Sequence, residues 1–243
     1  IVKECKFYVK NKIITEKSLT KENVSVTMFL YSQKGKRFMT QRNSGVLMHI
    51  SSLPGKYGIG SFGQSAYDFV DFLVETKQTY WQILPLTTTS YGDSPYQSFS
   101  AIAGNPHLID FDLLLEAGLL EEADVDGVHF GDREDLVDYA LIYQVRRPIL
   151  EKAAQRFLAD DRNKALLAAF EKANSSWLND YAEFMAIKES FGNKALQEWD
   201  DKAVIARNEE VLAQYRIDLA EQIDYFKVCQ YFFFSQWKAL KAY

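Results

Sequence analysis

A short polar segment, residues 91–97 (YGDSPYQ), concentrates the side chains of this sequence that could recognise a small polar ligand. Its tyrosines offer rigid apolar faces with a polar edge, and its Asp, Ser and Gln side chains can pair with hydrogen-bond donors and acceptors. Sugars match this chemistry, because their rings have flat apolar faces surrounded by hydroxyl groups. The residue types therefore predict a carbohydrate-binding loop, with a purely structural tyrosine-rich loop as the alternative.

Three histidines, His49, His107 and His129, are the other candidates for catalysis or metal binding. None has another His or Cys at metal-ligand spacing, so the sequence predicts no metal site. His49 lies at the end of a predicted strand, where its ring could bind a sugar hydroxyl or satisfy the polar groups of a buried loop. Both interpretations stay open.

Hydrolysis or transfer of a glycosidic bond uses two positioned carboxyl groups. Asp93 lies in the aromatic segment, but the sequence supplies no convincing partner for it. Asp68 and Asp71 fall on a predicted helix and are expected to face solvent, whereas Asp110 and Asp112 are expected to cap a helix or to be solvated. The sequence therefore predicts no catalytic residue.

Residues 58–63 (GIGSFG) match the GxGxxG pattern of dinucleotide-binding proteins. The preceding strand is expected to end at Ile50, too far upstream for the tight turn that this pattern requires. The next strand closes on Pro85 and Leu86, without the acidic residue that would bind a ribose. A nucleotide-dependent sugar enzyme is therefore a disfavoured alternative.

A parallel βαβ unit is predicted upstream of the polar segment. The apolar run at 45–50 (GVLMHI) indicates a buried strand, residues 65–77 have helical periodicity, and residues 80–86 (YWQILPL) indicate a second buried strand. A strand, a helix and a strand in this order form a right-handed crossover. The loops 51–63 and 87–106 then lie at the same edge of the sheet.

The rest of the chain is expected to be helical. A brief extended segment over 107–111 and a helical turn over 112–117 precede it, and Pro148 should kink or split the first long helix. Asn163 is expected to cap the next helix, and Ser175 or Ser176 the one after it. The predicted helices are 138–160, 164–173, 177–190, 202–219 and 224–243.

Two parallel strands cannot form a sheet that is buried on both faces, so the sheet is expected to continue beyond Tyr243. The predicted fold class is α/β, the N-terminal part of a (β/α)8 TIM barrel with a mostly helical insertion after strand 2. The expected divisions are a leader or arm at 1–38, the first barrel strands and substrate-binding loops at 39–118, a helical insertion subdomain at 119–222, and a barrel helix before a missing third strand at 223–243.

Composition and net charge limit the classes of partner expected for this chain. The 243 residues are 47% hydrophobic with a net charge of −5, which disfavours nucleic acid and anionic membranes as partners. The sequence contains no apolar run long enough to cross a bilayer and no signal-type start. Cys5 and Cys229 form no CxxC pair, which is typical of structural thiols in a reducing compartment. A cytoplasmic microbial protein is expected.

The first 38 residues differ from the rest in their lysine content. We interpret Met39 as the natural start, preceded by a translated leader that contains a ribosome-binding site. A genuine flexible N-terminal arm is the alternative. A mature N-terminus upstream of Met39, measured on protein from the native host, would rule out the leader.

Residues 42–118 resemble the start of a 4-α-glucanotransferase, one of the amylomaltases or disproportionating enzymes of glycoside hydrolase family seventy-seven. The resemblance depends on the SLPG…YGIG loop, the WQ-LPL strand and the YG-SPYQS and AGNP segments, and it continues more weakly to the QYFFFSQWKALKAY helix. It implies retaining transfer of an α-1,4-glucan segment to glucose or a maltooligosaccharide, in maltodextrin or starch metabolism, with no nucleotide, flavin or metal cofactor.

The resemblance also implies roles for individual residues. Tyr96, Ser94 and Asp93 would contact sugar near the acceptor side, Tyr91 would lie at an outer glucan-contact surface, and Tyr139 would lie beside it. No segment matches the family's nucleophilic Asp, acid/base Glu or stabilising Asp, so the chain is expected to be inactive alone. A non-catalytic glucan-binding fragment is the alternative.

Overall fold

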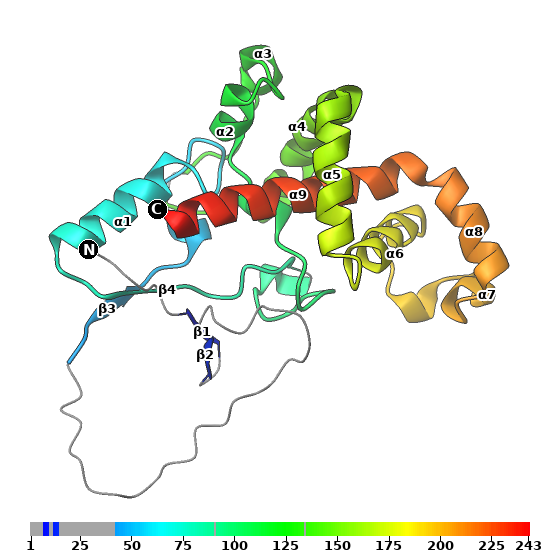
Figure 1. Ribbon diagram of the computed structural model, residues 1–243, viewed down its shortest axis with the longest axis horizontal. Coiled ribbons are helices and arrows are strands. Elements are labelled where there is room, and N and C mark those ends of the chain that lie inside the picture. The colour runs from blue at the N-terminus through cyan, green and yellow to red at the C-terminus, as the bar shows by residue number, and fades with distance from the viewer. Residues whose placement is uncertain (1–6, 10–11, 15–41, 90, 134) are drawn as a thin grey trace, which may run out of the picture.

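The computed structural model describes residues 7–9, 12–14, 42–89, 91–133 and 135–243. A short parallel sheet and α1 lie on one side, most of the helices lie on the other, and the long helix α9 connects the two sides (Figure 1). The Met39 start, Cys5 and most of the expected leader lie outside the described residues. The helices and strands are β1 (Phe7–Val9), β2 (Lys12–Ile14), β3 (Gly45–Leu47), η2 (Ile50–Ser52), α1 (Gln64–Glu75), β4 (Tyr80–Gln82), η3 (Tyr91–Asp93), η4 (Pro106–Leu108), α2 (Phe111–Glu116), α3 (Glu122–Val125), α4 (Tyr139–Ala159), α5 (Asp161–Ala173), α6 (Leu178–Ser190), η5 (Leu196–Glu198), α7 (Lys202–Ile205), α8 (Glu209–Asp218) and α9 (Ala220–Ala242).

The predicted βαβ unit is present. Strands β3 and β4 pair in parallel, with Val46 opposite Trp81, and α1 connects them. Each strand is three residues long, so both are shorter than predicted. The expectation of two buried strands is wrong for the described structure, since Leu47 is 57% exposed. Only one face of this two-stranded sheet is covered by α1, where the Phe69 ring packs against Trp81 at 4.9 Å.

Helix α9 organises the core. It begins at Ala220, four residues earlier than predicted, and packs against α4, α5, α6 and α8. Phe232 and Phe233, in the middle of the YFFF run, are buried on it and belong to the core. Tyr243, which directly follows α9, reaches α1, where its hydroxyl donates to Oδ1 of Asp71 at 2.8 Å.

Several helix boundaries differ from the sequence-based expectations. Helix α4 continues through Pro148 without a break. Asp160, rather than Asn163, caps α5 by accepting from the backbone N–H of Arg162. No side chain caps α6, so the expected serine cap is absent from its start.

Two further segments were predicted wrongly. The helix expected over 202–219 is divided into α7 and α8, because Arg207 adopts φ 56° and Asn208 then caps α8. The segment expected to be extended over 107–111 contains the short 3-10 helix η4, which begins at Pro106 behind an Asn105 cap.

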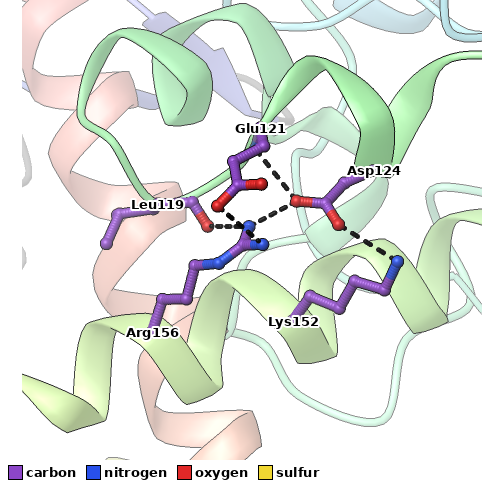
Figure 2. A network of polar contacts seen from close by, with 5 residues as sticks. All are labelled: Leu119, Glu121, Asp124, Lys152 and Arg156. Atoms are coloured by element: carbon purple, nitrogen blue, oxygen red, sulfur yellow. Dashed lines mark hydrogen bonds and ion pairs between the residues drawn. The ribbon is translucent and has the colours of Figure 1, made fainter.

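A buried carboxylate attaches α3 to α4 (Figure 2). Asp124 forms ion pairs with Arg156 and, at 3.1 Å, with Lys152, both from α4. Its Oδ2 also accepts from the backbone N–H of Glu121 at 2.9 Å. The Arg156 guanidinium, followed by that backbone donor, holds the pKa of Asp124 well below its usual range.

Candidate functional site

The segment after β4 forms a closed loop. Thr87 and Gly104 form an antiparallel bridge, the backbone N–H of Asn105 donates to the Leu86 carbonyl at 2.8 Å, and that of Thr88 donates to the Ala103 carbonyl at 3.3 Å. We call the paired segments 86–88 and 103–105 the neck, and residues 88–103 the β4 loop. The polar segment 91–97 therefore lies on a loop whose two ends are paired with each other at the neck.

Hydrogen bonds within the β4 loop fix its shape. The Thr88 and Ser98 hydroxyls lie 2.9 Å apart, and Ser94 Oγ accepts from the backbone N–H of Tyr96 at 3.3 Å. Gly92 and Asp93 both have positive φ, at 70° and 53°, which turns the chain sharply. This turn leaves Tyr96 at the surface, where the residue is 70% exposed.

A side chain of helix α4 forms hydrogen bonds with this loop, which the sequence did not reveal. The Tyr143 hydroxyl donates to Oδ1 of Asp93 at 2.8 Å and lies 2.9 Å from Oγ1 of Thr89. Burial raises the pKa of Tyr143 to about 12, and the bond to Asp93 acts in the same direction. The phenol therefore stays protonated at neutral pH and can hold the Asp93 carboxylate in place.

Tyr139 lies one turn before Tyr143 and contacts the other predicted loop. Burial raises its pKa, while the neighbouring Ser51 side chain acts in the opposite direction. Ser51 belongs to the loop after β3, and the Asp93 charge also acts on Tyr139. One turn of α4 thus connects the loops that follow both parallel strands. The side chain of Tyr91, expected beside Tyr139, lies outside the described residues.

The two histidines near these loops are neutral. Burial lowers the pKa of His49 to about 4, and burial followed by the Arg146 charge lowers that of His107 to about 3. Within the described part of the chain, neither Nδ1 has a hydrogen-bond partner. The His107 ring meets the Tyr143 ring edge-on at 4.8 Å, so His107 supports the residue that holds Asp93.

Arg146 is a fully buried residue that sequence analysis missed. Its guanidinium donates to the carbonyls of Tyr57 at 3.2 Å and Ile109 at 2.5 Å, and lies 4.0 Å above the Phe111 ring. Arginine on a helix usually faces solvent, so only the position of the neighbouring loops reveals this role. Arg146 fixes the 51–63 loop against the segment that leaves the neck.

The glycine-rich segment has a structural role. A Cβ on Gly63 would lie 2.1 Å from Oδ2 of Asp110, and that same oxygen accepts from the Ser61 hydroxyl at 2.5 Å. A carboxylate therefore fills the N-terminal end of α1, where a nucleotide phosphate would need to bind. This arrangement argues against the nucleotide-dependent alternative.

The other acidic candidates have structural partners as well. Asp110 caps α2 through the backbone N–H of Leu113, and Asp112 accepts from the Tyr57 hydroxyl at 2.6 Å. Asp68 and Asp71 are exposed on α1, as predicted. Across the described ranges, no three His, Cys, Asp or Glu side chains gather as ligands for a metal ion. The helices in those ranges also include none with the length and apolar character needed to cross a membrane.

Comparisons with known proteins agree with the resemblance. The family model described as 4-alpha-glucanotransferase matches residues 48–243. The 4-alpha-glucanotransferase of Streptococcus pneumoniae is 62% identical over 205 residues, which cover 84% of this chain and 40% of that protein. That of Clostridium butyricum is 50% identical over 196 residues, covering 81% and 40%.

A solved structure is similar as well. The amylomaltase from Streptococcus agalactiae in complex with acarbose aligns with a TM-score of 0.81 at 61% identity, covering 83% of this chain and 41% of that one. The chain thus spans about 40% of the length of the relatives it matches. On these grounds, the chain belongs to the 4-alpha-glucanotransferase family.

Proposed function

We propose that this chain forms the acceptor-side glucan-binding part of a 4-α-glucanotransferase, with Asp93, Ser94 and Tyr96 as sugar contacts. The observation that carries the proposal is the β4 loop, on which an exposed tyrosine ring stands three residues from a carboxylate held by Tyr143. A ring of this kind can stack on a sugar face while the carboxylate accepts bonds from hydroxyl groups.

The contact with Tyr143 supports the assignment of Asp93 as a sugar ligand. Tyr143 donates to its Oδ1, so the orientation of the carboxylate is set before a ligand arrives. Preorganised groups bind more tightly because less ordering is needed on association. His49, Tyr139 and Tyr91 are proposed as more peripheral contacts along the same pair of loops.

The proposed reaction is retaining transfer of an α-1,4-glucan segment to the 4-hydroxyl of glucose or of a maltooligosaccharide. A retaining mechanism uses a carboxylate nucleophile and an acid/base carboxyl group. We infer that these groups are outside this chain, because its acidic residues near the site serve as helix caps and structural pairs. The fold is proposed to be the first part of a (β/α)8 barrel, with the helices after the β4 loop as an insertion.

Titration of this chain with acarbose and with maltoheptaose tests the binding proposal, and glucose release from maltotriose tests the inferred location of the acids. We expect binding without turnover. Absence of binding at millimolar ligand would contradict the proposed site. Glucose release by this chain alone would show that the catalytic carboxylates are within it.

A further inference from the structure

We propose that Gln230 of α9 is a positioning residue that fixes the neck of the β4 loop, and through it the sugar contacts on that loop. This inference rests on the proposed function. Gln230 does not reach the predicted contacts itself. It acts on Gly104, which is 126 residues away in the sequence.

The bond between Gln230 and Gly104 is two-sided. The Gln230 Oε1 accepts from the backbone N–H of Gly104 at 2.8 Å, and its Nε2 donates to the Gly104 carbonyl at 3.0 Å. One side-chain amide thus satisfies both polar groups of a single residue, as a neighbouring strand would. Because Gly104 is also bridged to Thr87, this contact attaches both sides of the neck to α9.

The packing around the neck allows the backbone of Gly104 to lie close to α9. A Cβ on Gly104 would lie 2.2 Å from the Phe233 ring, so only glycine allows the backbone to come this close to α9. Gln230 itself is 1% exposed. An apolar side chain could fill the same volume without the cost of desolvating an amide. A buried amide whose hydrogen bonds are all satisfied instead favours one unique geometry. We therefore assign to Gln230 the role of fixing the position of the neck against α9.

Gln236 provides a matched control on the same helix. It makes the same pair of bonds to the backbone of Asp110, at 2.8 Å and 3.0 Å, and it is 7% exposed. Asp110 lies beyond η4, outside the neck. Loss of either glutamine should cost similar stability, but only loss of Gln230 should change the β4 loop.

The test compares Gln230→Met and Gln236→Met in the full 243-residue chain. Methionine keeps the unbranched shape and removes both hydrogen bonds. We expect both variants to lower the melting temperature by similar amounts. Gln230→Met should also weaken maltoheptaose binding about tenfold and accelerate hydrogen exchange of the β4-loop amides. Gln236→Met should change neither property more than about twofold.

A milder variant covers the case in which Gln230→Met does not fold. Gln230→Asn keeps the amide but withdraws it by one methylene group, and it should weaken binding to an intermediate extent. Wild-type affinity in a folded Gln230 variant, or an equal loss in Gln236→Met, would overturn the proposal. If the wild-type chain binds no maltoheptaose, the proposed function fails, while exchange at the β4 loop still decides the role of Gln230.

Discussion

The Tyr143 hydroxyl lies 2.8 Å from Oδ1 of Asp93, across 50 residues of sequence. One residue belongs to a long helix and the other to the turn that the sequence indicates as a sugar-binding segment. The loop is therefore held at two places, at its neck by backbone pairing and at its polar turn by a phenol. A loop restrained in this way loses less conformational freedom when it binds a ligand.

Tyr143→Phe should weaken maltoheptaose binding by about fivefold to tenfold, because it removes one hydrogen bond to a charged group and frees the Asp93 carboxylate. The ring and its contact with His107 remain, so the melting temperature should change little. Titration calorimetry and thermal unfolding measure the two effects. Tyr215→Phe removes a phenol whose oxygen lies 3.5 Å from an Asp201 oxygen on another part of the molecule, and it should leave affinity unchanged.

Tyr96→Ala should reduce maltoheptaose affinity by about tenfold or more without affecting stability. The exposed ring is available for stacking, and burial of such a ring contributes about 1.5–3 kcal/mol. Ile217, which is 71% exposed on α8, offers a control of equal exposure. Equal affinities of wild type and Tyr96→Ala would show that Tyr96 is not a sugar contact.

Local sequence signals predicted the elements around the site well. The apolar spacing that indicated a helix places Ala66 and Leu73 in the core, and two short apolar runs gave the parallel strands. The polar turn at 91–97 lies on a closed loop after the second strand. These features depend on residues close in sequence, so periodicity and turn residues suffice to find them.

The supports of the site could not be predicted in the same way. The partners of Tyr143, Arg146 and Gln230 are tens of residues away in the sequence or more. No local sequence pattern predicts which residues these partners are. A signal existed for Gln230, because a glutamine beside Cys229 in an aromatic run is an unusual polar residue in a core helix. The break between α7 and α8 was hidden because Arg207 adopts positive φ, which a non-glycine residue rarely does.

Asp124→Asn should destabilise the chain by about 2 kcal/mol at neutral pH, because it weakens the pairs with Arg156 and Lys152. Denaturant unfolding measures this loss. Asp135→Asn is the matched control, since the Asp135 pair with Arg133 is exposed to solvent and should contribute little.

The contribution of Asp124 should depend on pH. Its pKa in the folded chain lies below the ordinary value of 3.8, so the folded state favours the charged form. The stabilisation is therefore complete above about pH 5 and declines as the pH falls through the ordinary value towards the lowered one. Wild type and Asp124→Asn should converge in stability under these acidic conditions. A constant difference down to the acid limit would contradict this assignment.

Gly104→Ala should destabilise the chain by about 3 kcal/mol, because the new methyl group would overlap the Phe233 ring and push the neck away from α9. The loss should be smaller in a Phe233→Leu background, where the ring is absent. A double-mutant cycle on unfolding free energies measures this coupling, which is expected to be about 1 kcal/mol or more. Strictly additive losses would mean that the close approach of Gly104 to α9 does not depend on Phe233. The same cycle read by maltoheptaose affinity would show whether the position of the neck and the sugar contacts change together.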